Sequence, residues 1–94
     1  MKDISIEEPK MYLPIGSIVL LKNNFTMYMI SGYVNKNENG KINDYMGVPY
    51  PYGLISFDSL YFFDHKDIEE VLYIGYKDKD YEFLNKILNS KDKL

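Results

Sequence analysis

The sequence predicts an α+β fold, in which a small, curled antiparallel sheet of about four or five strands is followed by a C-terminal helix. Short runs rich in Ile, Val, Met and Tyr alternate with turn residues, which is the pattern of antiparallel strands. The longest run, residues 25–34, carries apolar side chains on both faces, as expected when a small sheet curls on itself. From Asp78 onward the apolar spacing becomes helical, and this indicates the final helix.

The chain has 94 residues, 46% of them hydrophobic, which suits one domain with a single modest core. No apolar run approaches the ~18 residues of a membrane span, and the first residues do not resemble a signal peptide. Cysteine is absent, so disulfides, thiolate metal sites and cysteine nucleophiles are excluded. We therefore expect a cytoplasmic protein.

The first half of the chain is expected to form a hairpin and the start of a third strand. Residues 1–12 are charged and are predicted to be a flexible N-terminal arm, so that the packed domain spans residues 13–94. After a turn at 13–17, residues 18–22 form a strand, and the pair Asn23-Asn24 turns the chain into the strand 25–34. In that strand Gly32 indicates a bulge or a sharp bend.

Beyond the hairpin, residues 35–41 are predicted to be an exposed tip, and 42–48 the next strand. Because Pro49 and Pro51 cannot donate to a ladder, residues 49–53 are predicted to be a protruding loop. Residues 54–63 are expected to be an irregular extended segment.

The rest of the chain is expected to hold one helical turn, the last strand and the helix. Asp64 suits the N-cap of a turn over 65–70, before a last strand over 71–76. The final helix is predicted over about 78–91, capped by Asp78 or Asp80. Its apolar stripe combines two sets of positions, Tyr81, Leu84 and Leu88 with Phe83 and Ile87.

The charge distribution argues against a nucleic-acid partner. The formal net charge is −3, arginine is absent, and all 11 basic residues are lysines. Without arginine no side chain offers the planar fork that grips phosphate or guanine. Residues 45–70 alone carry −4, and such a run is either a solvated face or a surface for an electropositive partner.

Catalytic and ligand-binding motifs are not evident in the sequence, and we expect neither enzyme activity nor a cofactor. Ser59, Asp64 and His65 supply the residue types of a hydrolase triad, but an adjacent Asp and His can seldom orient one another. The single His without Cys does not suit zinc, and the glycines form no phosphate-binding loop. No catalytic, cofactor or metal residue is therefore predicted.

Aromatic residues are concentrated in the same segment as the negative charge. Seven of them, from Tyr45 to Phe63, fall within 19 residues. Tyrosine gives a large, rigid and amphipathic contact area and is enriched at protein interfaces. We expect Phe57, Phe62 and Phe63 to enter the core, and Tyr50 and Tyr52 to be exposed. The predicted partner-binding residues are Tyr45, Tyr50, Tyr52, Asp64, His65, Asp67 and Glu70.

Four segments, taken in order, resemble a family of small domain-of-unknown-function proteins from low-GC Gram-positive bacteria. They are LPIGSIVLLK (13–22), MYMISGY (27–33), DYMGVPYPYG (44–53) and FFDHKDIEEVLYIGY (62–76). The family is associated with type VII (ESX) secretion and LXG toxins. The resemblance implies a small cytoplasmic factor that binds such a toxin, or its helical targeting region, as a targeting factor or chaperone. An immunity protein that neutralises the toxin is the alternative.

For the architecture we expect an SH3-like, partly open barrel, with a flat sheet covered by the helix as the alternative. The resemblance carries no catalytic residues with it. The oligomeric state is left open.

Overall fold

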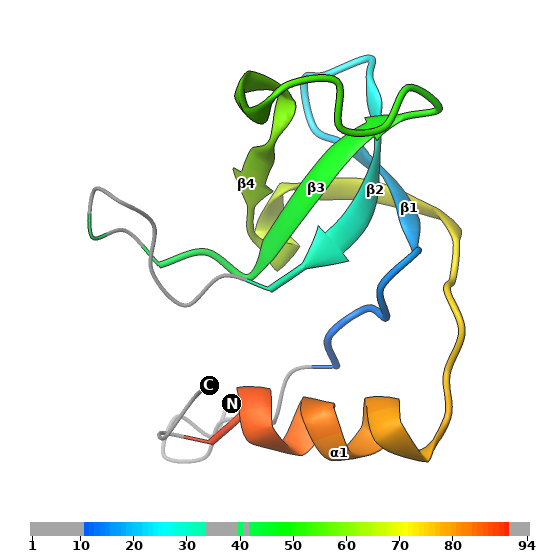
Figure 1. The fold of residues 1–94 in the computed structure, drawn as a ribbon, viewed down its shortest axis with the longest axis vertical. Helices are drawn as coiled ribbons and strands as arrows, with labels where there is room; N and C mark the ends of the chain where they lie inside the picture. Colours follow the sequence, from blue (N-terminus) through cyan, green and yellow to red (C-terminus); the bar gives the residue numbers. More distant parts are fainter. Residues whose placement is uncertain (1–10, 34–39, 41, 91–94) are drawn as a thin grey trace, which may run out of the picture.

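In a computed structural model, which describes residues 11–33, 40 and 42–90, a five-stranded antiparallel sheet precedes one helix (Figure 1). The strand order is β4-β3-β2-β1-β5. The elements are β1 (Ile18–Leu21), β2 (Met27–Gly32), β3 (Tyr45–Tyr50), β4 (Tyr61–Phe63), β5 (Ile68–Tyr73) and α1 (Lys79–Leu88), with 3-10 turns at Phe57–Ser59 and His65–Asp67. The α+β fold is confirmed. Residues 1–10 of the expected arm and most of the expected tip at 35–41 lie outside the described residues.

The two edges of the sheet, β4 and β5, are joined by the shortest connection in the fold. The chain leaves β4 at Phe63 and enters β5 at Ile68 through a single 3-10 turn. So short a connection between opposite edges requires the sheet to curl. No ladder joins β4 to β5 among the described residues, so the sheet is not closed into a barrel.

The hairpin of β1 and β2 follows its predicted turn chemistry. Asn23 has a positive φ of 58°, a conformation that asparagine tolerates better than most residues. The Asn24 side chain accepts the N–H of Thr26 at 2.9 Å, so β2 begins at Met27 rather than at Phe25. The bulge predicted at Gly32 is confirmed, because the ladder with β3 shifts register between Ile30 and Gly32.

The predicted protruding loop at 49–53 is partly wrong, because Pro49 and Tyr50 complete β3. Pro49 pairs with Tyr28 of β2, and its carbonyl accepts the N–H of Gly53 at 2.7 Å. In a strand the nitrogen and carbonyl of one residue point to the same side. The missing N–H of Pro49 therefore faces the turn, beyond the end of the three-residue β4, and costs no ladder bond.

The expected helical turn over 65–70 is shorter than predicted, and β5 starts earlier. Ile68 already pairs with Leu21 of β1, so the 3-10 turn ends at Asp67. The β1–β5 ladder has two register shifts, which leave Glu69 and Leu72 of β5 as extra residues. The expected irregular segment 54–63 contains the other 3-10 turn and β4.

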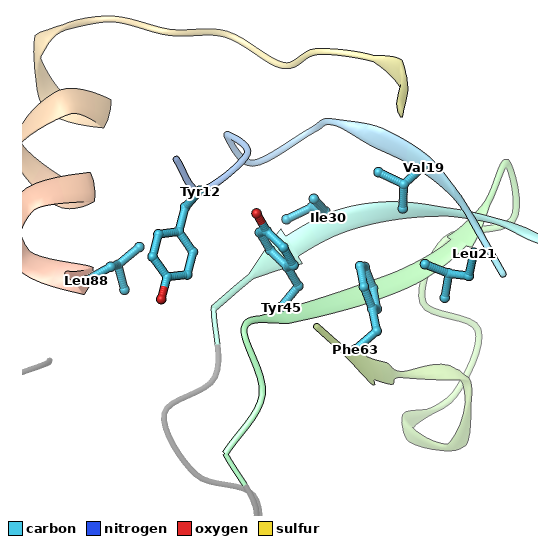
Figure 2. Close-up of a cluster of buried hydrophobic side chains, with 7 residues drawn as sticks. All are labelled: Tyr12, Val19, Leu21, Ile30, Tyr45, Phe63 and Leu88. Atoms are coloured by element: carbon cyan, nitrogen blue, oxygen red, sulfur yellow. The ribbon is translucent and has the colours of Figure 1, made fainter. Parts of the chain in front are cut away.

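The core lies on the inner face of the curled sheet and continues toward α1 (Figure 2). Figure 2 shows its side chains in one row from the sheet to the helix, and these are Leu21, Val19, Phe63, Ile30, Tyr45, Tyr12 and Leu88. Leu84 and Ile68 pack against this cluster. The helix thus shares one core with the sheet.

The segment Tyr12–Leu13 connects the sheet to α1 through its backbone. Leu13 donates its N–H to the Tyr45 hydroxyl (2.8 Å) and accepts from the Tyr33 hydroxyl (2.6 Å). Tyr12 donates its N–H to Asn85 Oδ1 of α1 (3.0 Å) and accepts from the Tyr81 hydroxyl. Tyr12 is also buried. The packed domain therefore includes Tyr12, whereas the predicted boundary at Leu13 placed it in the N-terminal arm.

α1 lies beyond the end of the sheet where β2 ends and β3 begins (Figure 1). Of its predicted apolar stripe, Leu88 is buried and Tyr81 and Leu84 are half-buried, whereas Phe83 is exposed. Asp78 is the N-cap, and its carboxylate accepts the N–H of Tyr81 at 3.0 Å. Before the helix, Gly75 passes so close to the Ile15 carbonyl that a Cβ would collide with it.

We expect Asp78→Ala to lower the free energy of unfolding by about 1 kcal/mol, because the Tyr81 N–H at the helix start loses its acceptor. Urea denaturation followed by circular dichroism measures the change. The control is Asp80→Ala in the first turn, which we expect to change stability by less than about 0.5 kcal/mol. Equal losses from both variants would show that charge near the helix start, and not the cap, is what matters.

Candidate protein-binding surface

Tyr45, one of the predicted partner-binding residues, is fully buried, and its place on a partner surface was wrong. Its hydroxyl binds Leu13 and lies 3.1 Å from His65 Nδ1. Its ring lies 5.5 Å from that of Phe63 and 4.9 Å from that of His65. Both the ring and the hydroxyl are thus used inside the fold.

Burial also changes the acidity of the inner tyrosines. Desolvation raises the pKa of Tyr33 to about 12, with a smaller contribution from Tyr81. Desolvation is likewise the main cause that raises the pKa of the Tyr45 hydroxyl, partly offset by the Leu13 backbone hydrogen bond. Both hydroxyls therefore remain protonated donors or acceptors at neutral pH.

Residues 64–67, which we call the acidic turn, hold the start of β3 through hydrogen bonds. Asp64 Oδ1 accepts the N–H of Asp44 (2.8 Å) and the side-chain amide of Asn43 (3.3 Å). The Asp67 carboxylate accepts the backbone N–H of Asp64 at 2.9 Å, as in a capping box. The predicted N-cap role of Asp64 at this turn is thereby confirmed.

His65 follows Asp64 and packs its ring against the core, although 30% of its side chain is exposed. The backbone N–H of His65 donates to Asp44 Oδ2 at 2.9 Å, and the His65 ring lies 5.1 Å from that of Tyr12. Of the predicted acidic residues, Glu70 is exposed, on β5. The carboxylates of Asp64 and Asp67 each accept hydrogen bonds inside the fold, and both residues are partly exposed.

The predicted residues fall at opposite ends of β3 and do not form one surface. Asp64 and His65 contact the residues where β3 begins, whereas Tyr50 ends β3 and Tyr52 follows it. A strand of six residues separates the two groups by roughly 17 Å.

A group of exposed apolar side chains lies at the end of the sheet where β3 finishes. Tyr50 and Tyr52 are 41% and 72% exposed, which confirms that this pair is on the surface. The ladder pairs Met27 with Tyr50, so the β1–β2 turn with its fully exposed Phe25 lies at the same end (Figure 1). We call this surface the aromatic end, and its residues are Phe25, Tyr50, Tyr52, Leu54, Ile55 and Phe57.

The aromatic end is held in place by its own backbone hydrogen bonds. The chain turns after a cis Tyr50–Pro51 peptide, and Gly53, at φ 76°, donates to the Pro49 carbonyl. Further along, Ser59 donates both its N–H (2.9 Å) and its hydroxyl (2.6 Å) to the Ser56 carbonyl. Residues 50–57 include no charged side chain. The segment therefore presents apolar side chains from an ordered backbone.

The phenylalanines divide differently from the prediction. Phe63 is buried as expected, Phe62 is 37% exposed, and Phe57 is 83% exposed and so does not enter the core. Phe57 opens the 3-10 turn that precedes β4 and so lies outside the paired strands of the sheet. Sequence reasoning therefore missed Phe57, Leu54 and Ile55 as surface residues. The turn-forming residues Pro51 and Gly53, which come just before them, could have indicated that these side chains lie on the surface.

Ser59, Asp64 and His65, which were considered above as a hydrolase triad, do not form one site. The Ser59 hydroxyl is bound to Ser56, whereas His65 contacts Tyr12 and Tyr45 at the other end of β3. Across the described part of the chain, no three His, Asp or Glu residues are placed to hold a metal ion. Nor is any helix in that part long and apolar enough to span a membrane.

A model of the family described as "Domain of unknown function (DUF4176)" matches residues 12–84, which is most of the chain. No curated protein and no solved structure shows a significant match. The matched region begins at Tyr12, the first core residue, and ends within α1 at Leu84. It therefore includes the sheet, the aromatic end and the acidic turn.

We expect Tyr45→Phe to lower the free energy of unfolding by about 1–3 kcal/mol, because the Leu13 N–H loses its acceptor inside the fold. Tyr50→Phe is the matched control, since that tyrosine is on the surface, and should cost less than about 0.5 kcal/mol. Denaturant unfolding measures both. A Tyr45→Phe variant as stable as the control would contradict the role given to this hydroxyl.

The free energy of unfolding should also fall between about pH 10 and about pH 12. Unfolded phenols ionise near pH 10, whereas folded Tyr33 keeps its proton up to about pH 12. In that window the folded chain binds more protons, so its stability decreases as the pH rises. Urea midpoints across the window should fall less steeply in Tyr33→Phe than in the wild type. Identical slopes would rule out a contribution from Tyr33.

Proposed function

The chain belongs to the DUF4176 family, and we propose that it is a non-catalytic, protein-binding accessory factor of type VII secretion. In this proposal it acts in the cytoplasm as a targeting factor or chaperone for an LXG-type toxin. The secretion role rests on the resemblance of four segments of the sequence. The binding role rests on one structural observation, the aromatic end.

Three properties of the aromatic end support protein binding. Its side chains are large and apolar, and most of them are more than half exposed. They lie at the same end of the sheet, and large exposed apolar groups of this kind are uncommon on soluble domains without a function. Its two tyrosines are of the residue type enriched among the side chains that dominate binding energy at interfaces. The acidic turn carries part of the −4 charge of residues 45–70. Its carboxylates Asp64 and Asp67, however, already accept backbone N–H groups inside the fold.

The proposal predicts that Tyr50→Ala with Tyr52→Ala weakens partner binding more than tenfold, because two aromatic contacts are lost from the surface. The tagged chain is co-expressed with an LXG-type toxin from the same organism, and co-purified toxin is quantified. The control is Tyr76→Ala with Phe83→Ala, which removes two rings that are 80% and 66% exposed and lie away from the aromatic end. Circular dichroism verifies that both double variants are folded.

The outcomes separate the alternatives. If the Tyr50/Tyr52 variant binds like the wild type, the aromatic end is not the binding surface. If no toxin co-purifies and a deletion strain exports it normally, the secretion role is wrong. If deletion poisons the cell but leaves export intact, the chain is an immunity protein.

A further inference from the structure

The contact between the Tyr45 hydroxyl and the His65 ring depends on the protonation state of the histidine. The Tyr45 hydroxyl oxygen accepts the N–H of Leu13 at 2.8 Å, so its own proton needs another partner. The nearer ring nitrogen of His65, Nδ1, lies 3.1 Å from this oxygen. In a neutral imidazole one nitrogen donates and the other accepts. When the ring proton is on Nε2, Nδ1 accepts the Tyr45 proton, and the hydroxyl has both its partners.

Protonation of the ring removes this acceptor. In the imidazolium ion both nitrogens carry a proton and can only donate. Tyr45 is fully buried, so its hydroxyl proton cannot turn to water while the surrounding chain stays in place. A buried donor without a partner is costly, whereas the same donor in water is not. Protonation of His65 therefore favours a form in which the Tyr45 hydroxyl reaches solvent.

Solvent protons can reach His65, because 30% of its side chain is exposed. Among the described residues, two segments other than its own turn place titratable groups against the ring. At the start of β3, Asp44 Oδ2 lies 4.0 Å from Nε2, beside the Tyr45 hydroxyl. From the N-terminal segment, the Tyr12 ring lies 5.1 Å from the imidazole. The charged residues of the turn itself are Asp64, Lys66 and Asp67.

Asp44 stays beside His65 whether or not the N-terminal segment is in place. Its Oδ2 accepts the backbone N–H of His65 at 2.9 Å, and its own N–H donates to Asp64 Oδ1 at 2.8 Å. Both bonds lie between the acidic turn and the start of β3, and neither uses residues 12 or 13. The carboxylate therefore gives the imidazolium the same counter-charge in both forms. The group whose partner changes is the Tyr45 hydroxyl.

The Tyr12–Leu13 segment is the part of the fold that covers this hydroxyl, and it also carries α1. Tyr12 donates its N–H to Asn85 and accepts from the Tyr81 hydroxyl. Leu88 of α1 lies next to Tyr12 in the core (Figure 2). Within the described part of the chain, no hydrogen bond joins α1 directly to a strand. If the segment leaves the sheet, α1 therefore goes with it.

We propose that protonation of His65 releases the Tyr12–Leu13 segment, and α1 with it, from the sheet. The proton passes from solvent to Nδ1, and the Tyr45 hydroxyl then donates to water. The five strands remain paired, because their ladders do not use these side chains. This pH-dependent release goes beyond the protein-binding role proposed above and does not require it.

NMR of the full chain without a partner tests the proposal between about pH 7.5 and about pH 5, a range that spans the usual titration of histidine. His65 is the single histidine of the chain, so its ring signals are identified directly. We expect the Leu13 amide signal to shift with the same midpoint as the His65 ring. Amide hydrogen exchange, corrected for intrinsic rates, should show α1 protection about fivefold lower or more at the acidic end. The amides of β1 and β2 should keep their protection.

Variants separate His65 from other titrating groups. In His65→Gln the amide oxygen can accept the Tyr45 proton at every pH, so α1 protection should stay constant. Tyr45→Phe removes the hydroxyl, so α1 protection should be low at both pH values and should not depend on His65. If this buried variant does not fold, His65→Leu takes its place. It has neither an acceptor nor a charge, and it should also give low protection at both pH values.

Three results would overturn the proposal. Unchanged α1 protection in the wild type would show that the segment stays in place around a charged ring. An equal loss of protection in β1 and β2 would show that acid destabilises the whole fold. A loss that persists in His65→Gln would assign the effect to another group. Since none of these measurements involves a partner, they leave the protein-binding role to its own test.

Discussion

The backbone of Tyr12 and Leu13 crosses from the sheet to the helix without belonging to either, and its polar groups must find partners outside regular structure. Three tyrosine hydroxyls and one asparagine side chain supply them. Two of these partners come from the sheet side of the core and two from α1. An unpaired amide or carbonyl inside a fold is costly, so this short segment requires all four. The docking of α1 and the burial of Tyr45 both depend on it.

The same arrangement gives the many tyrosines distinct roles. Tyr33, Tyr45 and Tyr81 use their hydroxyls to satisfy the backbone, and Tyr12 contributes its ring to the core. Tyr50 and Tyr52 remain on the surface. A chain without tryptophan or alanine thus uses one residue type both to hold its interior and to present a contact area. The buried core lies on the inner face of the sheet, and the surface proposed for binding lies at one end of it.

Local patterns in the sequence predicted the local structure well. The Asp78 cap, the bulge at Gly32 and the turn at Asn23-Asn24 depend on neighbouring residues, and all three are confirmed. The extent of β3 was not predicted, because Pro49 is tolerated only where β4 fails to reach it. Tyr12 was assigned to the arm because its partners are more than 60 residues away in α1. Tyr45 and Phe57 were misplaced for the same reason, since burial depends on which strands become neighbours.

The two extra residues in β5 have a consequence for how the molecule behaves at high concentration. β5 is one edge strand of a sheet that is apolar on both faces. The backbone groups at such an edge can pair with a strand of another chain, and this leads to aggregation. The bulges at Glu69 and Leu72 interrupt the regular spacing of its amides and carbonyls, so an incoming strand cannot form a continuous ladder. The opposite edge, β4, is only three residues long. The bulged edge and the short edge therefore both disfavour polymerisation of the sheet through strand pairing, while its faces stay accessible to other contacts.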